Sequence, residues 1–146
     1  MFLVVAQSDA AQAALRNGVY AVLGETATAS EAALPYDAKY SDADRNAPRR
    51  YITLDAHSFV PLVLAAPPQA RQDDRGWTLL SVTLARQHLG TLEAFTRAHL
   101  GGRVAIVLDG EIVTIHKVRS VISDGRVQVS RCHDNACQIL RARLAK

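Results

Sequence analysis

The sequence predicts an α+β fold, in which a mainly antiparallel sheet has helices packed on one face. Apolar residues make up 49% of the 146 residues, which is enough for a packed core. An Asp-Gly pair at 109–110 joins two apolar runs, a pattern typical of a tight β-hairpin. The segments 85–100 and 134–144 have the apolar spacing of helices. With strands from Thr78 and at 126–131, the C-terminal half takes the order β-α-β-β-β-α.

The N-terminal half is predicted to consist of short strands separated by loops. Apolar runs predict strands at 2–6, 19–23, 51–54 and 60–65. Ser8 or Asp9 can cap a helix that runs to Arg16. The stretch 25–50 is polar, contains prolines and many charged residues, and is predicted to be a long charged loop.

In the C-terminal half, the hairpin and the first helix are predicted to share a core. A two-residue turn places Leu108 opposite Glu111, Ile106 opposite Val113 and Val104 opposite Ile115. These side chains share one face, and we expect the helix to pack there through Leu92 and Phe95. Val107 and Ile112 make the other face apolar as well, which predicts that it too is covered. The last helix is expected to point Ile139, Leu140 and Leu144 inward.

Charge and hydropathy exclude two broad classes of protein. The longest apolar stretch, at 59–68, is far shorter than the roughly 20 residues that span a bilayer, so no membrane span is predicted. There are 17 Lys and Arg against 14 Asp and Glu, with the excess of positive charge in the C-terminal third. No aromatic residue follows Phe95, so that third has no platform for stacking bases, and we expect no nucleic-acid partner.

Cys132 and Cys137 are the only cysteines, and their spacing is not that of a CxxC redox motif. His133 lies between them, but a zinc site would need a further ligand from elsewhere in the chain. A local disulfide is favoured, in an oxidising compartment, if Cys132 ends a strand and Cys137 lies in the first turn of a helix. Asp134 is suited to cap such a helix. We therefore predict a disulfide, no metal site and no cofactor.

Several C-terminal segments resemble the SecD family of protein-export membrane proteins. They are Ser-Val-Thr-Leu at 81–84, the run Gly-Arg-Val-Ala-Ile-Val-Leu-Asp-Gly-Glu-Ile-Val at 102–113, and Val-Ile-Ser-Asp-Gly-Arg-Val-Gln-Val-Ser at 121–130. The resemblance spans about residues 80–144 and is to the head part of the first large periplasmic domain. It implies the fold of that head and a periplasmic location. SecD continues into membrane helices, so the resemblance does not imply a translocase.

The resemblance and the composition lead us to expect one domain over residues 1–146. Residues 1–77 would supply the N-terminal strands and the charged loop 25–50, and residues 78–146 would form the SecD-head-like subdomain. The N-terminus has no basic region and a short apolar run, so the chain as written carries no signal peptide. Either the protein is cytosolic or a signal peptide has been removed, and the cysteine pair and the resemblance favour an exported, periplasmic protein whose signal has been removed.

No constellation in the sequence indicates catalysis. Cys132, His133 and Asp134 have the residue types of a nucleophile, a base and an orienting acid, but the side chains of neighbours in sequence rarely point at a common centre. The acidic pairs Asp42/Asp44 and Asp73/Asp74 lie in loops beside arginines, where solvated ion pairs are the usual outcome. The sequence therefore predicts a protein that is not an enzyme.

The first hypothesis is an exported inhibitor or immunity-type protein that binds and neutralises a secreted enzyme or toxin. Trp, Tyr and Arg anchor protein interfaces most often, so charged loops that carry them are the candidate partner-binding surface. These residues are Arg49, Arg50, Tyr51, Arg71, Asp73, Asp74 and Trp77. The alternative is an accessory of Sec-type export or envelope quality control that binds unfolded chains. A homodimer through the edge strand 126–131 or 2–6 also stays open.

Overall fold

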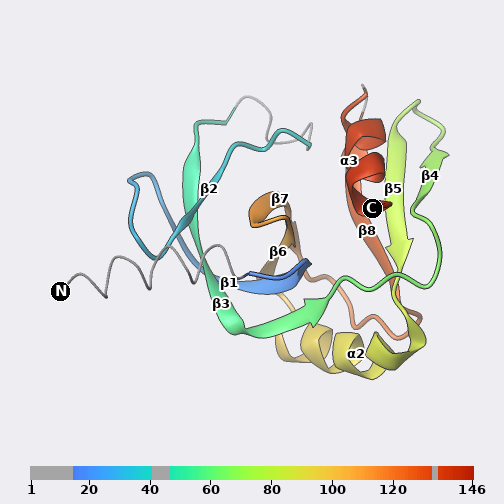
Figure 1. The fold of residues 1–146 in the computed structure, drawn as a ribbon, viewed down its shortest axis with the longest axis horizontal. Helices are drawn as coiled ribbons and strands as arrows, with labels where there is room; N and C mark the ends of the chain where they lie inside the picture. Colours follow the sequence, from blue (N-terminus) through green and yellow to red (C-terminus); the bar gives the residue numbers. More distant parts are fainter. Residues whose placement is uncertain (1–14, 41–46, 133–134) are drawn as a thin grey trace.

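The computed structural model describes residues 15–40, 47–132 and 135–146, and its strands form two antiparallel sheets (Figure 1). The larger sheet has the order β2-β3-β1-β6-β7 and the smaller one β4-β5-β8. The strands are β1 (Gly18–Thr26), β2 (Leu34–Tyr36), β3 (Arg50–Pro61), β4 (Gln69–Gln72), β5 (Thr78–Thr83), β6 (Arg103–Leu108), β7 (Glu111–Lys117) and β8 (Arg126–Cys132). The helices are the 3-10 turn η2 (Arg86–His88), α2 (Leu89–Ala98) and α3 (Ala136–Leu144). The predicted α+β class is confirmed, whereas the division into two sheets was not anticipated.

The larger sheet has a cluster of buried apolar side chains on each of its faces. Its end strands, β2 and β7, lie against each other, so the sheet curls around an inner cluster of apolar side chains. This cluster contains Tyr20, Leu34, Tyr36, Ala38, Ile52, Ala105, Val107 and Ile112. The expectation that the face carrying Val107 and Ile112 is covered is therefore confirmed. The cover comes from β2 and the residues after it, within the stretch 25–50 that was predicted to be a long charged loop.

A second cluster joins the outer face of the larger sheet to both helices and to the smaller sheet. It takes Val19 and Val60 from the larger sheet, Leu92 from α2, Leu80 from β5 and Leu140 from α3. Helix α3 packs on the smaller sheet, as Figure 1 shows. One core therefore holds the two sheets together.

Helix α3 differs from the prediction in one inward residue. Leu140 and Leu144 are buried as expected, but Ile139 is 49% exposed. The helix begins at Ala136, and its buried stripe is Ala136, Cys137, Leu140 and Leu144. Ile139 lies off this stripe because, at about 100° per residue, its side chain points roughly 100° away from Leu140 and further still from Cys137 and Leu144.

The strands of the N-terminal half are longer than predicted. The segments 51–54 and 60–65 were expected to be separate strands, but β3 runs without a break from Arg50 to Pro61. It is held by β1, which pairs with it from Gly18 opposite Pro61 to Thr26 opposite Tyr51. The strand predicted at 2–6 lies outside the described residues, as does all but the end of the helix predicted to run to Arg16.

The β6–β7 hairpin has the predicted turn but not the predicted register. Leu108 lies opposite Glu111, as expected, and the turn residues Asp109 and Gly110 have φ values of +52° and +78°. The pairing then shifts by one residue, so that Ile106 faces Thr114 and Val104 faces His116. The predicted pairs of Ile106 with Val113 and Val104 with Ile115 are therefore wrong. A bulge at Val113 causes the shift, and it brings His116 to the face that an unbroken hairpin would give to Ile115.

Candidate functional site

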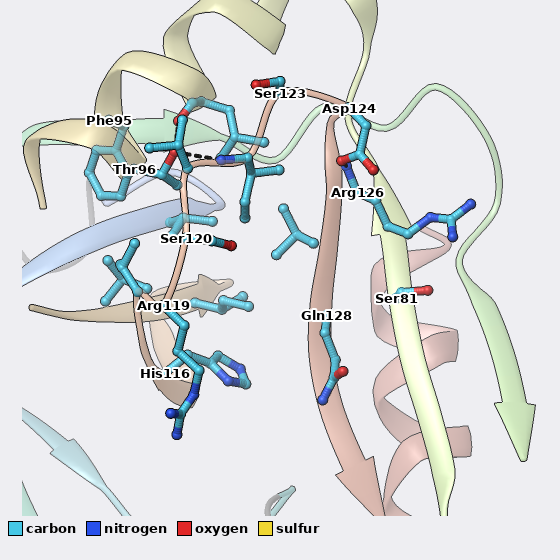
Figure 2. Close-up of a pocket in the computed structure, with 18 of the residues that line it drawn as sticks. Ser81, Phe95, Thr96, His116, Arg119, Ser120, Ser123, Asp124, Arg126 and Gln128 are labelled. Carbon is cyan, nitrogen blue, oxygen red and sulfur yellow. Dashed lines mark hydrogen bonds between the residues drawn. The ribbon is translucent and has the colours of Figure 1, made fainter. Parts of the chain in front are cut away.

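A cleft of about 850 Å³ lies between the two sheets. It is bordered by β7 and β8, which are end strands of different sheets. Figure 2 shows the polar side chains of the cleft on both of its sides, with His116, Arg119 and Ser120 across from Gln128 and Arg126. The site thus lies where the two sheets separate.

The floor of the cleft is apolar. Val104 and Ile106 of β6 and Val19 of β1 reach it from the larger sheet, and Leu92 and Phe95 reach it from α2. All five belong to the core shared by both sheets. A ligand in the cleft would therefore rest on packed, rigid side chains.

One wall is the connection between β7 and β8, which has no helix or strand of its own but is fixed at several points. The backbone N–H of Ile122 donates to Thr96 Oγ1 at 3.0 Å, and the Thr96 hydroxyl donates in turn to the carbonyl of Leu92. The N–H of Val118 donates to the carbonyl of Gly102 at 2.8 Å. These bonds tie the wall to α2 and to the turn that follows it.

The end of this wall depends on a glycine. Gly125 has a φ of +78°, which favours glycine, and a Cβ at this position would collide with the side chain of Leu89. The Gly125 carbonyl accepts a hydrogen bond from the N–H of Leu84 at 2.9 Å. The wall is thus preformed rather than assembled on binding.

The opposite wall is one face of the smaller sheet. Ser81 and Leu79 of β5, Gln128 of β8 and Gln69 and Arg71 of β4 line it. The other face of the same sheet carries α3. The smaller sheet therefore presents a mixed polar face to the cleft and an apolar face to the core.

His116 connects the two sheets at the edge of the cleft. Its Nε2 lies 2.8 Å from the carbonyl oxygen of Val129 on β8 and 3.1 Å from Thr114 Oγ1. Because a carbonyl only accepts hydrogen bonds, Nε2 carries a proton and donates. Burial lowers the pKa of His116 from its ordinary value, and the bond to Val129 opposes this only in part. The ring is therefore neutral at pH 7.

The predicted partner-binding residues fall on two parts of the fold. Arg50 and Tyr51 begin β3 of the larger sheet and Arg49 directly precedes it, whereas the other four lie in β4 or in the turn that follows it. Arg49 donates to both oxygens of Asp37, at 2.6 and 2.8 Å. The bonds from Arg49 lower the pKa of the Asp37 carboxyl. Arg50 pairs with Glu25 at 3.3 Å. These ion pairs link the start of β3 to the ends of β1 and β2.

The turn between β4 and β5 holds Asp73, Asp74 and Trp77. Asp73 accepts hydrogen bonds from the N–H groups of Arg75 and Trp77 and pairs with Arg131, which also lies 4.4 Å from the centre of the Trp77 ring. Burial raises the pKa of Asp73, but these hydrogen bonds outweigh it and lower the pKa overall. Arg71 lines the cleft, whereas the other six predicted residues do not. Their role in binding a partner stays a prediction.

Cys132 and Cys137 form a disulfide, with 5.8 Å between their Cα atoms. Cys132 ends β8 and Cys137 lies in the first turn of α3, which is the predicted arrangement. The predicted cap, Asp134, and His133 lie outside the described residues. No group of three or more His, Cys, Asp or Glu within residues 15–40, 47–132 and 135–146 could hold a metal ion. Because Cys132 is in the disulfide, it is not available as a nucleophile.

Most residues of the cleft were missed by sequence reasoning. The stretch 116–128 supplies one wall and both borders, yet from the sequence it was assigned only the start of the strand at 126–131 and part of the SecD resemblance. The signal that could have found it is the density of cations and serines in that stretch, with Lys117, Arg119, Ser120, Ser123 and Arg126. Composition alone does not separate such a stretch from an ordinary solvated loop.

The fold and the cleft define a class of protein, an α+β module in which two sheets share a core and separate around an open binding cleft. A family model described as the P1 head subdomain of SecDF matches residues 62–138, which is more than half of the chain. The chain therefore belongs to the SecDF P1 head family. The resemblance drawn from the hairpin and its flanking strands is confirmed.

Solved structures of SecDF share the fold. A structure described as a membrane component SecDF that enhances protein export matches with a TM-score of 0.51 and 22% identity over 95% of this chain. SecDF in a super-membrane-facing form gives 0.52 and 19% over 97%. SecDF from Thermus thermophilus, described as a translocon-associated membrane protein, gives 0.52 and 24% over 94%. No curated protein matches the sequence.

The chain corresponds to only a part of these proteins. It covers 65%, 24% and 20% of the three matched chains. No helix among the described residues is long and apolar enough to cross a membrane. The comparisons favour a module related to Sec-type export over an inhibitor or immunity protein, for which they offer no support.

Proposed function

We propose that the chain is a non-catalytic, periplasmic binding module related to protein export, and that it holds unfolded polypeptide in the cleft between β7 and β8. The single observation that carries the proposal is this cleft, with its apolar floor and polar walls, in a member of the SecDF P1 head family. The SecDF structures are described as components that enhance protein export or associate with the translocon. A binding site for chains in transit is consistent with such a role.

The size of the cleft suits part of an extended chain. Its volume of about 850 Å³ lies toward the upper end of the roughly 300–1,000 Å³ typical of ligand sites. An unfolded segment exposes apolar side chains, which can pack on the partly exposed Leu79, Val121 and Ile122 of the cleft, and a backbone that needs hydrogen-bond partners. Both requirements distinguish an unfolded chain from the polar surface of a folded protein.

The borders of the cleft supply backbone partners. End strands of a sheet leave a row of N–H and C=O groups without strand partners, and an extended peptide can add to such an edge. β7 lies against β2, whereas β8 ends the smaller sheet, and the hydrogen bond from His116 reaches β8 at Val129. The part of β8 before Val129 is therefore the segment along which we expect a bound chain to pair.

The disulfide supports the proposed location. Disulfides persist in oxidising compartments such as the periplasm and are rare in the cytosol. The Cys132–Cys137 bond is buried, with its two residues 0% and 1% exposed, so it belongs to the packing of α3 on the smaller sheet. A buried structural disulfide is expected in an exported protein.

The proposal is tested by comparing an unfolded protein with its folded form as ligands. A reduced and carboxymethylated protein stays unfolded in buffer, and its binding to the full chain can be measured by fluorescence anisotropy against the same protein in its native state. We expect binding of the unfolded form only. Gln128→Trp places a large ring on the exposed wall of the cleft and is expected to weaken binding at least about tenfold, or about 1.4 kcal/mol.

Gln72→Trp is the matched control, since Gln72 is an exposed strand residue of the same sheet that does not line the cleft. Equal affinities for Gln128→Trp, Gln72→Trp and the unchanged chain would rule out the cleft as the binding site. No measurable binding of the unfolded protein would rule out the proposed function itself.

A further inference from the structure

Most arginines outside the cleft have an acidic partner. The pairs are Arg49–Asp37, Arg50–Glu25, Arg97–Glu93, Arg103–Glu25, Arg131–Asp73 and Arg143–Glu111. Glu111 also pairs with Lys39 at 3.0 Å. The acidic residues of these pairs thus neutralise cations outside the cleft, and little negative charge lines the cleft itself.

The cations of the cleft differ from these arginines. Arg71, Lys117, Arg119 and Arg126 are all exposed and line the cleft, and none of them forms an ion pair with another described residue. Asp124 is the only acidic residue among the lining residues, and one of its oxygens accepts the backbone N–H of Arg126 at 3.0 Å. Four positive charges therefore surround a hollow that contains one negative charge.

The positions of the cations suit a ligand that runs through the cleft. Arg119 lies on one side of the opening and Arg126 on the other, as Figure 2 shows. Arg71 comes from β4, beyond β5 on the same wall as Arg126, and Lys117 from the end of β7. Like charges around a concave surface repel one another and attract an anionic ligand from a distance.

We propose that the cleft selects extended polypeptide segments in which acidic side chains alternate with apolar ones. The inference rests on the proposed function and specifies its substrate class. Successive side chains of an extended chain point to opposite sides, so apolar residues can face the partly exposed Leu79, Val121 and Ile122 of the lining while carboxylates face the cationic rim. Neither an apolar floor nor a cationic rim alone would favour this alternation.

Other anionic partners fit the cleft less well. Nucleic acid binding uses exposed aromatic side chains for stacking, and Phe95, the only aromatic residue of the lining, is 7% exposed and packed in the core. A lipid surface is flat and contacts a projecting face, whereas these cations surround a hollow of about 850 Å³. An extended chain is the anionic ligand that can enter the hollow.

The test uses three unfolded, fluorescently labelled peptides of equal length. They share the same apolar residues and differ only in whether every second residue is Glu, Gln or Lys. We expect the Glu peptide to bind about tenfold more tightly than the Gln peptide, because two or three exposed ion pairs together contribute roughly that factor. The Lys peptide is expected to bind most weakly, and added salt should reduce the difference between the peptides.

The double variant Arg119→Gln/Arg126→Gln is expected to bind the Glu and Gln peptides within about twofold of each other, since its rim has lost two of its charges. The matched control is Arg75→Gln/Arg86→Gln, two exposed arginines outside the cleft, and it should keep the preference for Glu. Loss of the preference in the control as well would assign it to net charge and overturn the inference.

The outcomes separate this inference from the proposed function. If all three peptides bind equally, the cleft binds unfolded chains without regard to charge, and only the inference fails. If none of them binds, the proposed function fails with it. A third outcome would identify an anionic lipid surface as the ligand of the cationic rim and overturn the inference. In that case the unchanged chain binds phosphatidylglycerol vesicles, the cleft variant does not, and neither distinguishes among the peptides.

Discussion

The two sheets differ in how many of their faces the core covers. In the larger sheet, β6 is buried at every residue except Arg103, because one cluster lies inside the curl and the other lies between the sheets. In the smaller sheet, β8 alternates between exposed and buried residues from Arg126 to Val129, and β4 is exposed throughout. The larger sheet acts as a scaffold, while the smaller one offers a face to the cleft.

This difference shows how a small domain can combine stability with an open site. Burying both faces of one sheet concentrates the apolar contacts there, and the second sheet then needs only one buried face. The sheets remain linked by the shared core and by His116. The predictions below test this division of roles, beginning with the largest expected effect.

The first prediction concerns the fragment of residues 78–146, which corresponds to the expected SecD-head-like subdomain. In the full chain, β6 pairs with β1, and the shared core includes Val19, Ala21 and Val60. The fragment lacks these partners, so β6 would become an exposed apolar edge. We expect no cooperative thermal unfolding for the fragment by circular dichroism, in contrast to the full chain. A cooperative transition would show that residues 78–146 fold without β1 and β3 of the larger sheet.

The second prediction compares one residue from each sheet. Ile106→Ala removes a side chain that is 1% exposed in the shared core and is expected to lower the free energy of unfolding by about 3 kcal/mol. Leu79→Ala truncates a half-buried side chain on the cleft face of β5 and is expected to cost about 1 kcal/mol. Urea denaturation measures both. Equal losses would mean that the cleft face of the smaller sheet is packed as tightly as the scaffold.

The third prediction concerns the disulfide, which fastens α3 to the sheet with one buried face. Cys132→Ala/Cys137→Ala is expected to lower the free energy of unfolding by about 2 kcal/mol, as the loop-entropy relation gives for a short loop. Adding a reductant should shift the urea midpoint of the unchanged chain but not that of the variant. Peptide binding should persist in the folded variant, because neither cysteine lines the cleft. An unchanged midpoint would exclude a stabilising role for the bond.

The strands around the hairpin were the easiest part of the fold to predict from sequence. The Asp-Gly turn fixes two residues at positive φ, and the alternating apolar residues on either side specify β6 and β7. The bulge at Val113 was not predictable in the same way, because Ile112, Val113, Thr114 and Ile115 form a run that fits either register. The register was decided by two cores that exist only in the folded chain.

The candidate site was harder to predict, because its signal is a contrast between paired and unpaired charges. Arg49 and Arg71 look alike in the sequence, each close to acidic residues. In the structure, Arg49 is held by Asp37, whereas Arg71 lines the cleft without an ion-pair partner among the residues described. Tertiary pairing of this kind cannot be derived from local composition. The disulfide was predictable because a strand end and a helix start constrain it locally.

The last prediction concerns pH and His116, which links the two sheets. Its pKa is lowered in the folded chain by burial, so the unfolded chain binds its proton more readily. Its contribution to stability is therefore fully present above the ordinary value of 6.5 and is lost as the pH falls below that value toward the folded pKa. We expect urea denaturation to give a lower free energy of unfolding at about pH 5.5 than at about pH 7.5.

His116→Gln is expected to reduce this pH dependence, because the glutamine amide can still donate to the Val129 carbonyl but does not titrate. His57→Gln, at an exposed residue of β3, is the control and should keep the full dependence. Glu25 and Asp73 also have lowered pKa values, but their contributions to stability change only at pH values near or below their ordinary pKa values of 4.5 and 3.8. They therefore do not mask the effect of His116 between about pH 5.5 and about pH 7.5. An identical loss of stability in His116→Gln and the unchanged chain would show that the link between the sheets does not depend on a neutral His116.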